Sequence, residues 1–193
     1  MYFELAVKDI RSLPKLEGTV HVNMALIIKF MNNFFFNPAE FPEIAKRNGL
    51  ENDDFLFNQG PTKGLGKIQF HDFNIAYGSV DIPNVTLFRN QIEAFQEFLM
   101  KATPTADQAK DLDFLLTLGE LFTLVPYGQL ILENKPIYNI EDDVIDQIFD
   151  VLVRDFSKYA LELYLKTSST KEQMDLFKKG FAACLEPKGY TVK

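Results

Sequence analysis

Apolar side chains recur at every third or fourth position through most of the second half of this 193-residue chain. The repeat between 84 and 101 consists of Val85, Phe88, Ile92, Phe95 and Leu99. This is the spacing of one face of an α-helix, and Asn84 is placed to cap its start. We expect two more such helices at about 106–133 and 144–165 and a shorter one after them, and amphipathic helices with short polar joints are typical of an antiparallel helical bundle. The sequence therefore predicts an all-α fold.

Polar residues and a proline refine where the later helices begin and bend. Thr105 and Gln108 have the spacing of a capping box, and so do Thr170 and Gln173. In this motif the hydroxyl and the side-chain amide each bond a free backbone N–H of the other residue. Pro126 lies inside the helix expected at 106–133 and should kink or split it, because proline lacks the N–H of the helical ladder.

The first 83 residues are less regular, although we expect residues 1–193 to form a single helical domain. Val20 to Phe36 has the composition of a helix that is apolar nearly all round, which Asn37 and Pro38 should end. Residues 37–83 are rich in Pro and Gly and are expected to form an irregular excursion between the first and second long helices. The helical bundle should then occupy 84–185, followed by a tail at 186–193.

Charge and composition exclude several function classes. The net charge is −7 and no run of Lys or Arg is present, so most of the surface would repel nucleic acid. The single Cys184 cannot form an internal disulfide and suits a reducing compartment.

The sequence has no basic amino-terminal region and no uninterrupted apolar run of spanning length, so we expect a cytoplasmic chain with no membrane span. The 19 Phe residues suggest apolar faces that need further cover, which favours a homo-oligomer.

Two short patterns invite chemical interpretations that the spacing does not favour. Residues 60–67 are glycine-rich, but their spacing differs from that of a phosphate-binding loop, and Ile68 stands where a Ser or Thr should bind magnesium. His71 followed by Asp72 is open to two interpretations, an oriented base or a histidine with a structural role. The structural interpretation is favoured, because no nucleophile or second metal ligand has suitable spacing.

Three segments carry a resemblance to a known family. The segment Pro14-Lys15-Leu16-Glu17-Gly18-Thr19 resembles the Glu-Gly-Thr loop near the carboxyl end of FAD-dependent acyl-CoA dehydrogenases. Residues 59–72 and 147–157 look like sequence blocks of a larger bacterial branch of that family. The resemblance extends to about Met174 and implies the carboxyl-terminal helical region of such an enzyme.

The resemblance also implies roles for individual residues. Glu17 would be the catalytic base that removes the α-proton of an acyl-CoA thioester, and Gly18 would contact this substrate. Thr19 and His21 would lie near the FAD cofactor, which accepts a hydride from the β-carbon. The family's flavin- and substrate-binding domains would lie upstream of Met1, so we expect the isolated segment to lack turnover and FAD. The alternative is a non-catalytic helical module for protein interaction or oligomerisation, because a helical bundle can host many functions.

Overall fold

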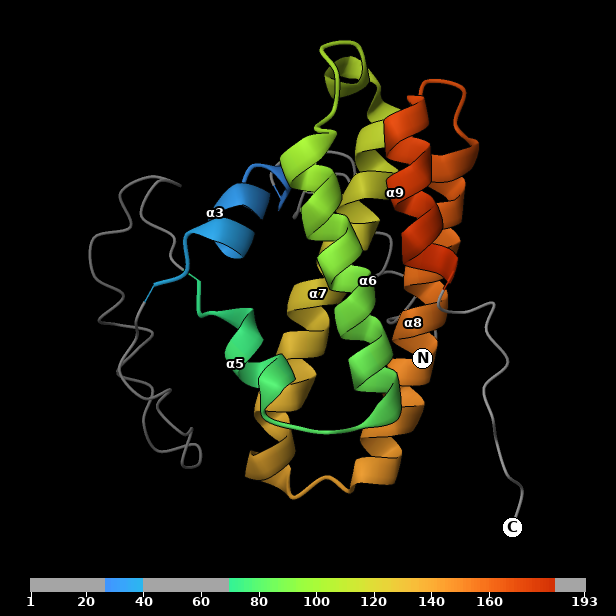
Figure 1. Cartoon of the computed structure of the whole chain (residues 1–193). Coiled ribbons are helices and arrows are strands. Elements are labelled where there is room, and N and C mark those ends of the chain that lie inside the picture. The colour runs from blue at the N-terminus through green and yellow to red at the C-terminus, as the bar shows by residue number, and fades with distance from the viewer. Residues whose placement is uncertain (1–26, 40–69, 183–193) are drawn as a thin grey trace, which may run out of the picture.

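The structure is a computed structural model that describes residues 27–39 and 70–182 (Figure 1). The part of the chain that it describes is helical and contains no strand, which confirms the all-α prediction. Its elements, in chain order, are α3 (Met31–Phe36), α5 (Phe73–Gly78), α6 (Pro83–Lys101), the 3₁₀ turn η2 (Gln108–Lys110), α7 (Leu112–Tyr138), α8 (Asp142–Leu165) and α9 (Lys171–Ala182).

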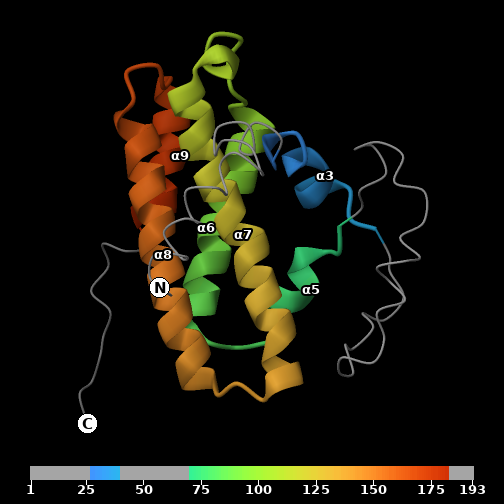
Figure 2. The same cartoon turned by 180° about the vertical axis from the view of Figure 1, so that it is seen from behind.

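The four longer helices lie side by side, with α8 packed against α6, α7 and α9, and α6 packed against α9 (Figures 1 and 2). Buried polar contacts fix their directions. Residues 84 and 91 of α6 bond residues 146 and 153 of α8 in the same order, so these two helices run parallel. In contrast, Asp113 and Lys135 near the two ends of α7 pair with Lys166 and Asp142 near opposite ends of α8, so α7 and α8 run antiparallel.

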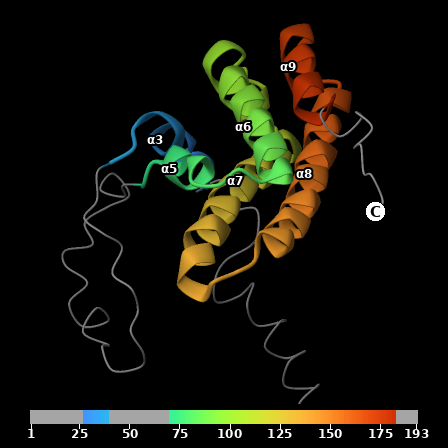
Figure 3. The same ribbon diagram turned by 60° about the horizontal axis from the view of Figure 1, so that its bottom comes forward.

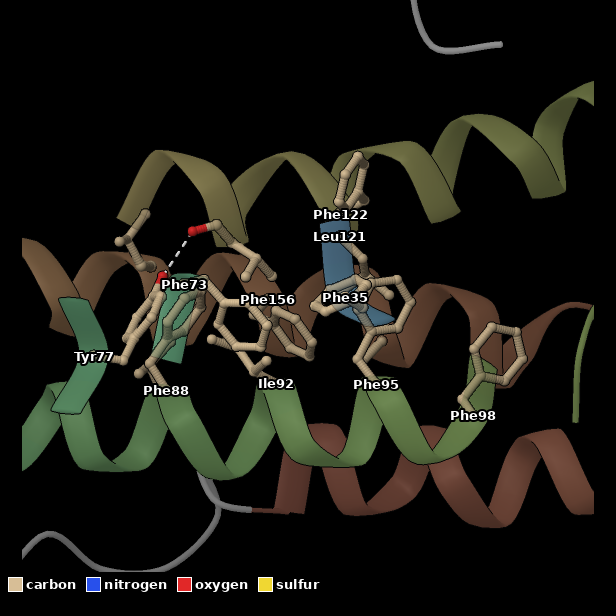
Figure 4. Packing of buried hydrophobic residues seen from close by; sticks show 14 of the residues in the cluster. Phe35, Phe73, Tyr77, Phe88, Ile92, Phe95, Phe98, Leu121, Phe122 and Phe156 are labelled. Atoms are coloured by element: carbon tan, nitrogen blue, oxygen red, sulfur yellow. Dashed lines mark hydrogen bonds between the residues drawn. The ribbon is translucent and has the colours of Figure 1, made fainter. Parts of the chain in front are cut away.

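The short helices α3 and α5 lie together beside α6 and α7, as the tilted view in Figure 3 also shows. Phe35 of α3 links the two long helices, since its ring centroid lies 5.6 Å from that of Phe95 on α6 and 5.7 Å from that of Phe122 on α7. Phe34 stacks on Phe73 of α5 with a centroid distance of 5.5 Å. These rings belong to one continuous aromatic core (Figure 4), because edge-to-face and offset rings fill space densely.

One buried hydroxyl reaches into the backbone of α7. Tyr77 of α5 is 1% exposed, and its hydroxyl donates a 2.7 Å hydrogen bond to the carbonyl oxygen of Val125, drawn as the dashed line in Figure 4. Gly128 makes room for it, because a Cβ at this position would lie 2.3 Å from the Tyr77 hydroxyl oxygen. Burial raises the pKa of Tyr77 well above its usual range, although a backbone hydrogen bond with Gln129 opposes the shift.

The two predicted capping boxes both form, and their glutamines also meet. Gln108 and Thr105 exchange hydrogen bonds, as do Gln173 and Thr170. The side-chain amides of Gln108 and Gln173 then bond each other reciprocally at 2.8 and 2.9 Å, with both residues 1% exposed. Gln173 also donates to the carbonyl of Ala102 at the end of α6. These contacts join the α6–α7 and α8–α9 connections at one end of the helices.

Several helix boundaries differ from those predicted. The first capping box opens η2 and not the long helix, which begins at Leu112 with Asp111 as its N-cap. Pro126 does not split this helix, which continues to Tyr138. Asn84 does not cap α6 either: Ile82 is the N-cap, while Asn84 is 3% exposed and bonds Asp146 of α8. The Asn84 side chain, which local spacing assigned to a cap, instead bonds the backbone of a residue on another helix.

The structure describes residues 37–39 and 70–83 of the predicted irregular excursion, and it corrects the prediction there. Residues 73–78, expected to be irregular, form α5, with Asp72 capping the backbone N–H of Asn74 at 2.9 Å. The apolar segment expected to be one helix up to Phe36 is interrupted by a turn at Lys29 and Phe30 before α3. Its predicted end at Asn37 is confirmed. Residues 40–69 and the segments expected before residue 27 lie outside the described residues.

Candidate functional site

The four residues that the family resemblance assigns to the site lie outside the part that the structure describes. These are Glu17, Gly18, Thr19 and His21. Glu17 precedes the first described residue, Ile27, by ten positions. Their roles as base, substrate contact and cofactor contacts therefore remain predictions.

The chain that follows this motif is firmly attached to the helices. Ile27 and Ile28 pack against the core, and Phe34 and Phe35 of α3 are 2% and 5% exposed. The ring centroid of Phe34 lies 5.4 Å from that of Phe122 near the middle of α7. Full burial of a Phe side chain contributes roughly 1.5–3 kcal/mol. The two rings of α3 thus hold residues 27–36 against α5, α6 and α7.

A surface cavity of about 380 Å³ lies between α5 and the carboxyl-terminal part of α7. Its polar lining consists of His71, Asp72, Ser79, Glu133 and Lys135, and its apolar lining comes mainly from Ile75, Ala76, Val80 and Leu132. The cavity brings the predicted pair His71 and Asp72 next to α7, which lies about 60 positions along the chain. Sequence spacing gave no signal for this meeting, because only the packing of α5 on α7 creates it.

Four of the five polar residues of this cavity make local or structural contacts. Asp72 accepts hydrogen bonds from the backbone and side chain of Asn74, and Ser79 donates to the carbonyl of Ala76. Glu133 accepts from Gln129 at 2.8 Å, and Lys135 pairs with Asp142 at 2.9 Å. The arrangement agrees with a structural role for Asp72 as a helix cap.

Two further hollows are also lined by carboxylates. One lies at the α7–α8 connection and is lined by Lys135 and by the acidic run 141–143. The other lies between α6 and α9, where Glu97 receives hydrogen bonds from Lys101 and Lys179 at 2.8 and 2.7 Å. These bonds lower the pKa of Glu97 to about 2. No group of acidic, His or Cys side chains within the described ranges could hold a metal ion.

None of these hollows offers a clear cradle for FAD. A pyrophosphate is bound by backbone N–H groups and cations. Lysines and carboxylates line all three hollows together, and Lys135 pairs with Asp142 while Lys101 and Lys179 both bond Glu97. The predicted cofactor contacts at Thr19 and His21 lie outside the described residues. FAD therefore remains a prediction that rests on the resemblance.

Helix α7 is long and apolar enough to cross a membrane by length and composition alone. Half of its most apolar window is buried against the rest of the protein, and the core helix of a soluble protein passes the same test. This is weak information on a membrane span. The predicted cytoplasmic location and the predicted absence of nucleic-acid binding are likewise untested by the structure.

Comparison with known proteins adds no assignment: no family model matches the chain, and no curated protein or solved structure matches it significantly.

Proposed function

We propose that this chain is the carboxyl-terminal helical region of an FAD-dependent acyl-CoA dehydrogenase, with Glu17 as the base for the α-proton. The observation that carries the proposal is the Glu17-Gly18-Thr19 motif on a segment whose continuation is anchored in the helical core. Phe34 and Phe35 supply that anchor. A base must be held steadily beside its substrate, so the proposal requires that the loop itself be fixed as well as its continuation.

The second resembling block supports a scaffold role for the helices. Residues 147–157 lie within α8, where Phe149, Leu152, Val153 and Phe156 are at most 3% exposed. Ser157 of the same block accepts a hydrogen bond from buried Gln91 of α6 at 2.8 Å. The block therefore contributes four side chains to the buried core, as expected of a helix in a supporting domain.

In this function the chain's own contribution is to position a carboxylate. Glu17 takes the proton next to the thioester carbonyl, and Gly18 lets the backbone approach the substrate closely. FAD supplies the hydride acceptor when it is bound. The flavin- and substrate-binding domains that the resemblance places upstream would be needed for turnover.

The test uses the natural polypeptide that contains this sequence. It should show flavin absorbance and reduce an electron-accepting dye when acyl-CoA is added. Glu17→Gln should abolish turnover while flavin absorbance is retained, whereas Glu93→Gln, at an exposed site on α6, should leave turnover unchanged. A colourless protein that ignores acyl-CoA, or a fully active Glu17→Gln variant, would contradict the proposal.

The alternative is a non-catalytic module for protein interaction, and one observation favours it. Most of the exposed large apolar side chains in the described segments lie on α7 and α8, namely Leu112, Tyr127, Leu130, Ile137, Tyr138, Val144, Val151, Leu161 and Leu165. Clusters of exposed apolar side chains often mark interaction sites, including those of the predicted homo-oligomer. A colourless protein whose mass exceeds that of one chain would support this alternative.

A further inference from the structure

The hydroxyl of Tyr77 contacts two backbone groups of α7 that a regular helix joins directly. It donates to the carbonyl oxygen of Val125 at 2.7 Å (Figure 4). Burial raises the pKa of Tyr77, and a hydrogen bond with the backbone of Gln129 opposes this shift. A bond that favours the phenolate is donated to the phenol oxygen, so the N–H of Gln129 is its donor. Residues 125 and 129 have the four-residue spacing of a helical hydrogen bond. The hydroxyl thus bonds both groups of one helical pair.

The sequence of α7 makes room for this hydroxyl. A Cβ on Gly128 would lie 2.3 Å from the hydroxyl oxygen. Pro126 has no N–H for the carbonyl of Phe122, so the neighbouring pair 122–126 has no ladder bond. Helices are distorted where a side chain inserts into the ladder of backbone hydrogen bonds. The backbone of α7 at 125–129 therefore relies on a partner from outside the helix.

Helix α5, which carries Tyr77, depends on its contacts with the rest of the protein. It has only six residues, and isolated helices shorter than about 12–15 residues are marginal in water. Phe73 is 3% exposed, and its ring centroid lies 5.5 Å from that of Phe34. When α5 leaves α7, its helical bonds, this apolar burial and the hydroxyl contact are therefore lost together.

We propose that α5 is a lid on α7 latched by the Tyr77 hydroxyl, and that release of α5 and opening of the α7 backbone at 125–129 are one conformational step. The hydroxyl is the latch because it bonds the carbonyl of Val125 and the N–H of Gln129 at once. In the released state both backbone groups lose this partner and become accessible to water.

The same step opens the cavity of about 380 Å³ between the two helices. Ala76 of α5 and Leu132 of α7 contribute to its walls. The side chain of Gln129 donates a 2.8 Å hydrogen bond to Glu133, which also lines the cavity. Gln129 therefore joins the latch to the cavity through its backbone and its side chain. The proposal is independent of the catalytic assignment, because it concerns only α5, α7 and the cavity between them.

Hydrogen exchange of single backbone amides in the full chain, followed by NMR, tests the proposal. Amides that are exposed by one opening step share its free energy. We expect the amides of residues 77 and 129 to have equal protection factors in the natural protein. The amide of Leu118, a fully buried residue nearer the start of α7, should be at least about tenfold more protected, because local openings cost less than global unfolding.

Tyr77→Phe removes the hydroxyl and keeps the ring. It should accelerate exchange at residues 77 and 129 together by about tenfold, which corresponds to about 1.4 kcal/mol and is the size expected for a lost hydrogen bond. Tyr127→Phe is the matched control, because it removes a hydroxyl from a 55% exposed residue of α7. This control should leave both exchange rates unchanged.

Two results would overturn the proposal. One is equal protection at residues 129 and 118 in the natural protein, which would show that the Gln129 amide does not open with α5. The other is a Tyr77→Phe variant in which exchange at residue 129 is unchanged, which would show that a direct bond to Val125 carries the ladder. If Tyr77→Phe does not fold, the comparison of residues 77, 129 and 118 in the natural protein decides alone.

Discussion

Gly128 in α7 should be far less tolerant of alanine than an ordinary helical glycine. A Cβ at position 128 would lie 2.3 Å from the Tyr77 hydroxyl oxygen and 3.3 Å from the ring of Phe149. Tyr77 is 1% exposed and its hydroxyl bonds the carbonyl of Val125 at 2.7 Å. The ring therefore cannot move away without losing this bond or compressing the core.

The cost can be estimated from three contributions. Overpacking a filled core destabilises by about 1–3 kcal/mol, and a buried hydroxyl without its partner costs about 1–3 kcal/mol. The better helix propensity of alanine offsets about 1 kcal/mol. We therefore expect Gly128→Ala to lower the free energy of unfolding by about 3 kcal/mol, measured by urea denaturation of the full chain.

Gly180 of α9 is the matched control, because a Cβ there meets Ala160 and Phe156 at ordinary distances of 3.4 and 3.5 Å. Gly180→Ala should change stability by less than about 1 kcal/mol. In a Tyr77→Phe background the hydroxyl is gone, and Gly128→Ala should then cost about 1 kcal/mol or less, so the two changes are not additive. Equal effects of alanine at 128 and 180 would refute this account of how α5 meets α7.

Two further predictions concern the ends of the helices. Gln173→Ala should lower the free energy of unfolding by about 2 kcal/mol, because it breaks both bonds to the Gln108 amide and removes the side-chain donor of the Ala102 carbonyl. A double-mutant cycle with Gln108→Ala should show strong coupling, and additive effects would contradict the reciprocal bond. The bonds from Lys101 and Lys179 lower the pKa of Glu97 from 4.5 to about 2, so the stability they provide is present above pH 4.5 and is lost as the pH falls towards 2. Glu97→Gln should weaken the dependence of the free energy of unfolding on pH in this acid range, measured by denaturation at a series of pH values. An unchanged dependence would show that the contact does not contribute to stability.

Local sequence rules were sufficient for most of the helical architecture. The stripe of α6 was predicted from its spacing, and its members Val85, Phe88, Ile92, Phe95 and Leu99 are all at most 7% exposed. The hydrogen bonds of both capping boxes were predicted correctly because a capping box needs only four consecutive residues, although the first box opens η2 and not the long helix. Apolar spacing and capping boxes depend only on residues within about one helical turn of each other, so the local sequence is enough to predict them.

The errors arose where distant residues decide the outcome. Asn84 was assigned to a cap, but its side chain bonds the backbone of Asp146, 62 positions away. Helix α5 has no long apolar repeat, and its burial depends on α3 and α7. The predicted site at Glu17 is a separate case, since it rests on a motif outside the described residues.

The most direct measurement of the central claim is proton exchange at the α-carbon of acyl-CoA. The natural polypeptide that contains this sequence is incubated with acyl-CoA in D₂O, and α-deuterium is followed by mass spectrometry. We expect exchange with the natural protein and with Glu93→Gln but none with Glu17→Gln, because only Glu17 is proposed to remove this proton. Undiminished exchange in Glu17→Gln would contradict the assignment of Glu17 as the base.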